Sequence, residues 1–178
     1  MSPCCYVQLF LFGLLSTGAV SAPTGECTNL RALSNIHLNQ VCGDWFCGKS
    51  NRHVPMDKST CLRILLHKVD ETTVAISLVL NETSLRQEYT TEDAENAGTL
   101  QMAGGNSTVQ VIYMSEDGTA MGIASCVPHQ AKPSVSLLSK QIPISSEKED
   151  ELRIALEQAG LSGDTEFVWE SEATCSST

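Results

Sequence analysis

Cysteine is the residue type with the widest chemical range in this sequence of 178 residues, which contains eight of them. Cys4 and Cys5 lie in an apolar N-terminal stretch. The other six are spread along the chain: Cys27, Cys42, Cys47, Cys61, Cys126 and Cys175. An even number of cysteines in an exported chain favours disulfides, although six cysteines allow many pairings and their spacing does not choose among them.

Zinc binding is the alternative chemistry for these cysteines. Structural zinc sites need closely spaced ligand pairs such as Cys-x-x-Cys, and this sequence has none. The histidines are scattered without such spacing: His37, His53, His67 and His129. We therefore expect disulfides and no metal site.

The N-terminal residues have the pattern of a secretory signal. An apolar run from Tyr6 to Leu15 is followed by Ala19-Val20-Ser21, whose small first and third residues suit signal peptidase. The run is shorter than the roughly 18–20 apolar residues that span a bilayer. We expect residues 1–21 to be removed and residues 22–178 to form an extracellular domain.

Charge and composition narrow the function classes. The chain has 11 Lys and Arg against 21 Asp and Glu, a net charge of −10, which excludes capture of nucleic acid or of an anionic membrane as its main activity. With 42% hydrophobic and 18% charged residues, the chain has the composition of a folded protein rather than of a disordered acidic segment. Sequons at Asn81 and Asn106 predict N-glycosylation and fit a secreted surface.

The elements that must position these residues are mostly short strands. In residues 73–80, Val74, Ile76 and Leu78 alternate with small or polar residues, which is the period of a half-buried strand. Residues 61–69 precede it across an Asp-Glu turn, so the two form a predicted hairpin. Further strands are expected at 84–90, 98–102, 109–114, 120–127 and 133–140. This spacing is typical of a sandwich or an up-and-down barrel.

One helix follows the strands. Ser146 and Glu149 have the spacing of a capping box, and acidic residues fill the first turn. Leu152, Ala155, Leu156 and Ala159 form one apolar stripe, and Gly160 is placed to end the helix. A last strand is expected at residues 166–169.

Together these features resemble the lipocalin family. Gly43-Asp44-Trp45-Phe46 is similar to the family's Gly-x-Trp motif at the start of the first strand. Residues 135–141 and the helix resemble its last barrel strand and following helix, and Lys140 matches the basic residue that packs over the motif tryptophan. The C-terminal stretch through Cys175 resembles tear-lipocalin and odorant-carrier members. Members usually bond this last cysteine to one in the fourth strand, and residues 84–90 contain none, which leaves its partner open.

The resemblance implies an eight-stranded antiparallel up-and-down β-barrel with one C-terminal helix packed outside. Such a barrel holds one small hydrophobic ligand, such as an odorant, pheromone, fatty acid or retinoid, and needs no cofactor. Alternation predicts the ligand-binding residues: Leu62, Ile64, Leu66, Val74, Ile76, Leu78, Leu80, Val135 and Leu137. Val111 and Tyr113 are expected to add another wall, with Ile112 and Met114 as the alternative pair.

A packed core without a cavity is the competing interpretation of the same apolar residues. Only 5% of the residues are aromatic, so few bulky side chains are available to fill a barrel. Met102, Met114 and Met121 suit either an adaptable lining or a core.

Two other functions compete with transport. Lipocalin-type prostaglandin D synthases use a cysteine of their second strand as nucleophile, and Cys61 stands at a similar place, with Arg63 and His67 on the same strand face. That face is opposite to Leu62, Ile64 and Leu66, which argues against access to a ligand. The second alternative is an immunomodulatory glycoprotein that binds a cell-surface receptor through its surface. We expect a non-enzymatic carrier, monomeric or weakly dimeric, without membrane insertion.

Overall fold

The computed structural model describes residues 30–52, 57–80, 83–127, 132–161 and 165–176. The expected signal peptide at residues 1–21, Cys27 and the Asn81 sequon lie outside these ranges, as does the side chain of Leu80. No helix in the described ranges is both long and apolar enough to span a membrane.

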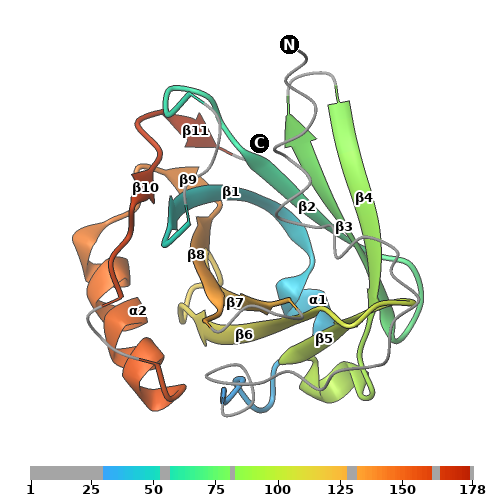
Figure 1. Cartoon of the computed structure of the whole chain (residues 1–178). Coiled ribbons are helices and arrows are strands. Elements are labelled where there is room, and N and C mark those ends of the chain that lie inside the picture. Colours follow the sequence, from blue (N-terminus) through green and yellow to red (C-terminus); the bar gives the residue numbers. More distant parts are fainter. Residues whose placement is uncertain (1–29, 53–56, 81–82, 128–131, 162–164, 177–178) are drawn as a thin grey trace.

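Eight antiparallel strands form a closed barrel (Figure 1). Each strand pairs with the next along the chain, and the first pairs with the eighth to complete the wall. The strands are β1 (Gly43–Ser50), β2 (Arg63–Lys68), β3 (Thr73–Leu80), β4 (Thr83–Thr90), β5 (Thr99–Met102), β6 (Thr108–Met114), β7 (Ala120–Cys126) and β8 (Ser134–Ser139). The predicted eight-stranded up-and-down topology is confirmed.

Six short or peripheral elements complete the described chain. They are α1 (Leu38–Val41), a 3₁₀ turn (Ala94–Asn96), β9 (Gln141–Ile142), α2 (Ser146–Gln158), β10 (Trp169–Glu170) and β11 (Cys175–Ser176). Strand β10 pairs with the end of β1, and β11 pairs with β9. The helix α2 lies outside the barrel, as expected (Figure 1).

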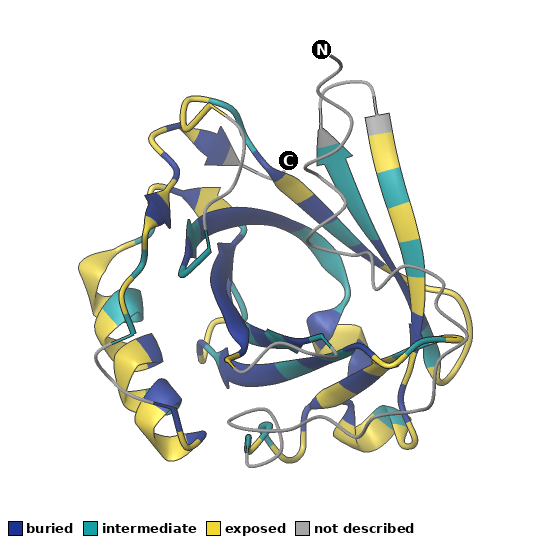
Figure 2. Ribbon diagram, viewed as in Figure 1, coloured by how far each residue is buried: buried dark blue, intermediate teal, exposed yellow. Residues whose placement is uncertain are grey.

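The β2–β3 hairpin has the register that the alternation predicts. Ile64 lies opposite Leu78, and Leu66 lies opposite Ile76. Ile64, Leu66 and Ile76 are all buried in the largest apolar cluster of the described residues. Along β4, which pairs with β3, exposed residues alternate with less exposed ones, as Figure 2 shows. They alternate because only one face of this strand is covered.

One end of the barrel is closed around Trp45. The backbone of Gly43 has φ of +136°, which favours glycine and lets the chain turn from α1 into β1. The Trp45 ring is fully buried, and its Nε1–H donates to the Val41 carbonyl at 3.0 Å. The Lys140 ammonium lies 5.0 Å from the Trp45 ring centroid. The expected packing of Lys140 over the motif tryptophan is therefore confirmed.

Helix α2 starts one position away from the expected cap. Ser145, not Ser146, is the N-cap, and its hydroxyl accepts from the Lys148 backbone N–H. Gly160 has φ of +87°, and the last turn closes where predicted. Leu152 and Leu156 bury the apolar stripe against the barrel. Gly122 permits this approach, because a Cβ there would lie 2.4 Å from a methyl group of Leu152.

The cysteines pair only in part as expected. Cys61, just before β2, is bonded to Cys175 in β11, and Cys126 is also disulfide-bonded. Cys42 and Cys47 are free thiols, so their assignment as disulfide candidates is wrong. The two cysteines are five positions apart on extended chain, about 16 Å, so they cannot bond to each other, because a disulfide needs Cα atoms within about 7 Å.

The two free thiols should differ strongly in reactivity. Burial raises the pKa of Cys47 to about 12, whereas Cys42 is only half-buried. We expect iodoacetamide at pH 8 to alkylate Cys42 in the folded protein at least about tenfold faster than Cys47, because the thiolate is the reactive species. Peptide mapping by mass spectrometry measures both rates. Equal rates in the folded state would contradict this burial of Cys47.

A polar network joins the β6–β7 turn to α2. The Asp117 carboxylate accepts from the Ser115 hydroxyl at 2.6 Å and from the Thr119 hydroxyl at 2.8 Å. Lys148 of α2 lies 3.0 Å from the same carboxylate. These contacts, the Ser115 hydrogen bond first, hold the pKa of Asp117 well below its usual range.

The lowered pKa of Asp117 predicts a specific acid sensitivity. A carboxyl group that is more acidic in the folded state stabilises the protein above its unfolded pKa of about 3.9 and loses that contribution as the pH falls further. Asp117→Asn should therefore be less stable than wild type at pH 7, and the difference should narrow below about pH 4. Urea unfolding at pH 7, 4 and 2.5 measures it. A difference that stays constant down to pH 2.5 would disprove the assignment.

Candidate ligand-binding site

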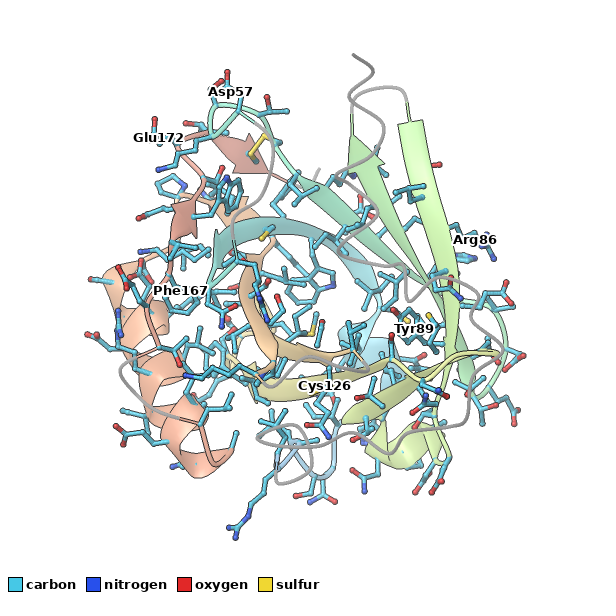
Figure 3. The ribbon with its side chains drawn as sticks, viewed as in Figure 1. Asp57, Arg86, Tyr89, Cys126, Phe167 and Glu172 are labelled. Carbon is cyan, nitrogen blue, oxygen red and sulfur yellow. A yellow bond between two sulfur atoms is a disulfide. The ribbon has the colours of Figure 1, made fainter. Side chains whose placement is uncertain are left out.

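The inner wall of the barrel is built from apolar side chains of all eight strands. Strand parity and the largest buried cluster place the same residues inside. These are Trp45, Cys47, Leu62, Ile64, Leu66, Val74, Ile76, Tyr89, Leu100, Val109, Val111, Met121 and Leu138, with Leu78, Met102, Met114 and Ile123 packed against them. Figure 3 shows Tyr89 on the inner side of β4 and Arg86 on its outer side.

Most of the residues predicted from β2 and β3 lie on this wall. Leu62, Ile64 and Leu66 are buried there with Val74 and Ile76. Leu78 is only partly buried and packs against the same cluster. Their part in ligand binding stays a prediction.

A bulge in β6 corrects the expected orientation of Tyr113. The pairing with β7 shifts between Val111 and Tyr113, so that the strand changes parity there. Val111 and Met114 face the barrel interior, whereas Ile112 and Tyr113 pack with α2. One residue of each predicted pair therefore faces the interior: Val111 of the first pair and Met114 of the alternative pair. The Tyr113 hydroxyl donates to Glu151 of the helix and is not a ligand contact inside the barrel.

The orientation of β8 is opposite to the expected one. Val135 and Leu137 are buried, but they pack against Leu152 and Leu156 of α2 outside the barrel. Leu138 faces inward, and Ser134 and Ser136 share its face. Every residue of β8 is buried because the helix covers its outer side. The apolar residues therefore did not reveal which face is inside.

Sequence reasoning also missed part of the inner wall. Tyr89, Leu100, Val109, Ile123 and Leu138 were not in the predicted set. Tyr89 is buried deeply enough to raise its pKa to about 12. The partly exposed side chains on this wall are Leu78, Met102, Met114 and Ile123, which come from four strands. Flexible methionines among them suit contact with ligands of variable shape.

A groove of about 560 Å³ lies on the outer side of the barrel. It is lined by Cys42, Gly43, Asp44, Leu65, Leu66, His67, Lys68, Ser77 and Arg86. Asp44 is ion-paired with Arg63 beside this groove. Its open shape and charged rim do not suit a wholly apolar ligand.

The structure removes the basis for a nucleophile at Cys61. Its sulfur is bonded to Cys175, so no thiol or thiolate is present at that position. The alternative function, an enzyme that uses the Cys61 thiolate as nucleophile, is therefore wrong. Among the described residues, no group of three or more His, Cys, Asp or Glu side chains is placed to hold a metal ion.

Comparison with known proteins finds similarity in structure and none in sequence. No family model matches the sequence, and no curated protein matches it. A solved siderocalin, Ex-FABP, described as functioning through dual ligand specificities, superposes with a TM-score of 0.53. The match covers 78% of this chain and 99% of that chain at 14% identity. The barrel has the lipocalin fold.

The lipocalin fold accounts for the arrangement of the parts described above. The eight-stranded wall, the motif tryptophan at the closed end and the single outer helix occur in their expected order along the chain. At 14% identity the match concerns the fold, and a closer relationship to tear-lipocalin or prostaglandin-synthase members stays a prediction.

Proposed function

We propose that this protein is a secreted carrier that binds one small hydrophobic molecule inside its barrel. The observation that carries the proposal is the inner wall itself, where apolar side chains from all eight strands face one another. Four of them remain partly exposed although they point inward. Burial of apolar ligand surface against such a wall contributes about 25 cal/mol per Å² before the costs of immobilisation.

Export is supported by three features of the chain. Residues 1–21 have the signal-peptide pattern, and residues 22–178 would form the mature domain. The Cys61–Cys175 disulfide is stable in an oxidising compartment. Asn106 is exposed in the turn between β5 and β6, where an oligosaccharide would project into solvent.

Odorants, pheromones, fatty acids and retinoids are the candidate ligand classes. All have a mainly hydrocarbon body that fits an uncharged wall. Transport of such a molecule requires release as well as binding, which suits micromolar rather than picomolar affinity.

Titration with the fluorescent probe N-phenyl-1-naphthylamine tests the proposal. We expect saturable binding of one probe per chain with a dissociation constant near about 1 μM, equivalent to about 8 kcal/mol. Urea-unfolded protein is the control and should not enhance the fluorescence. A folded sample that shows no saturable binding would overturn the carrier function and favour action through a surface receptor.

A further inference from the structure

One side of the inner wall is polar. Strands β10, β1 and β8 bring Trp169, Ser50 and Ser136 into direct register, because Ser50 is paired with Trp169 on one side and with Ser136 on the other. Ser134 lies two residues from Ser136 on the same face of β8. We call Ser50, Ser134, Ser136 and Trp169 the polar wall.

The polar wall lies away from the closed end of the barrel. Ser50 ends β1 and Ser134 starts β8, whereas Trp45 and Lys140 lie at the other ends of these strands. Leu62, just before β2, and Leu78 of β3 supply apolar surface to the same inner wall. A molecule held there would therefore meet hydrogen-bonding groups on one side and hydrocarbon on the other.

Two polar groups of this wall have no partner. Within the described ranges, three buried side-chain atoms lack a hydrogen bond: Gln110 Oε1, Ser134 Oγ and Trp169 Nε1. Gln110 has the parity of the outer face of β6, but the other two belong to the polar wall. Ser134 is 8% exposed and Trp169 is 1% exposed. Buried polar groups are almost always paired, so two unpaired ones together indicate a site for an absent partner.

The remaining groups of the wall are already engaged with each other. The Ser136 hydroxyl donates to Ser50 Oγ at 3.4 Å, and Ser50 Oγ also accepts from the Arg52 backbone N–H at 3.1 Å. Cys47 lies beside them and is fully buried as a neutral thiol. This neighbourhood therefore orients Ser50 and Ser136 and leaves the Ser134 hydroxyl and the Trp169 N–H to a ligand.

We propose that the polar wall binds a neutral hydrogen-bond acceptor on an otherwise hydrophobic ligand, such as a ketone, ester or alcohol oxygen. Indole N–H only donates, so a ligand atom that pairs with Trp169 must accept, and the Ser134 hydroxyl can donate to the same kind of atom. None of the four residues of the wall carries a charge, and Lys140 is held at the closed end over Trp45. Arg52, two residues beyond Ser50, directs its guanidinium to the Lys132 carbonyl at 3.1 Å. A carboxylate would lose its hydration among the uncharged side chains of the wall, which disfavours ionised fatty acids among the candidate ligand classes. The inference rests on the proposed carrier function.

Competition against N-phenyl-1-naphthylamine with three matched probes tests this inference. The probes are 2-undecanone, undecane and undecanoate, which share chain length and differ at one end. We expect wild type to bind 2-undecanone about tenfold more tightly than undecane or undecanoate, the value of one well-formed hydrogen bond. Ser134→Ala and Trp169→Phe should each remove most of that preference, so that each variant binds 2-undecanone and undecane with nearly equal affinity. Ser84→Ala, on the exposed face of β4, is the matched control.

The outcomes separate this inference from the carrier function. If none of the probes binds, the carrier function itself fails. If 2-undecanone and undecane bind equally, or if Ser134→Ala and Trp169→Phe leave the ketone preference intact, the carrier function stands and the polar wall is not a recognition site. Tighter binding of undecanoate than of 2-undecanone would overturn the choice of a neutral acceptor.

Discussion

Replacing both Cys61 and Cys175 with alanine lowers the free energy of unfolding by about 4–5 kcal/mol. The bond closes a loop across 114 residues, so its removal frees most of the chain in the unfolded state. It also ties the C-terminal β11 to the start of β2, which no other covalent link does among the described residues. Urea unfolding of the oxidised protein, followed by tryptophan fluorescence, measures the loss.

Cys42→Ala is the matched control for the disulfide. Cys42 is a half-buried free thiol before β1, and its loss should change the stability by less than about 1 kcal/mol. The double variant should still bind N-phenyl-1-naphthylamine at a temperature where it is folded, because neither cysteine lies on the inner wall. A double variant as stable as wild type would contradict the Cys61–Cys175 pairing. Loss of probe binding by a folded double variant would mean that Cys61 or Cys175 contributes to the ligand-binding site.

Replacing Leu78 with tryptophan blocks the barrel. Leu78 points inward from β3 and is only partly buried, so a larger side chain can enter the space that the ligand is proposed to occupy. We expect the affinity for N-phenyl-1-naphthylamine to fall by about 30-fold or more, equivalent to about 2 kcal/mol. The cost in folding stability should stay within about 1–3 kcal/mol, typical of an overpacked interior. Fluorescence titration and urea unfolding measure the two effects.

Val79→Trp separates the interior from the outer surface. Val79 is the next residue of the same strand and faces outward opposite Arg63 and Ser84. This variant should bind the probe like wild type. If Val79→Trp loses binding and Leu78→Trp retains it, the ligand binds on the outside of the barrel and the proposed site is wrong.

The sequence predicted the elements whose environment differs between their two faces. In β3 the large apolar residues Val74, Ile76 and Leu78 face inward while the small Ala75 and polar Ser77 face outward, and the β2–β3 register followed from that pattern. The apolar stripe of α2 was visible for the same reason. The Gly-x-Trp motif could be located in the sequence because both of its residues have specific tasks. Gly43 adopts a positive φ that favours glycine, and the Trp45 ring packs under the Lys140 ammonium.

The inner faces of β6 and β8 could not be read in this way. Helix α2 covers the outside of both strands, so β6 has apolar residues on both faces and β8 has Val135 and Leu137 on its outer face. The face with apolar residues therefore no longer marks the barrel interior. In β6 the bulge also exchanges the faces between Val111 and Tyr113, and nothing in a run of apolar residues marks it. The serines of β8 were therefore overlooked as inward residues, although they form part of the polar wall.

The pairing of the cysteines could not be predicted from the sequence either. Cys61 and Cys175 are 114 residues apart and meet only because β11 is brought back beside the start of β2. Cys42 and Cys47 are close in sequence, but an extended strand holds them apart. Spacing along the chain therefore gave no measure of distance in space.

Native mass spectrometry of the protein collected from the medium of secreting cells, after enzymatic removal of N-glycans, tests the carrier function most directly. The carrier function predicts a folded chain that carries one small apolar molecule, which dissociates on collisional activation and is recovered by organic extraction. A folded, empty chain that also takes up no added 2-undecanone or N-phenyl-1-naphthylamine would contradict it and would mean that the side chains fill the barrel.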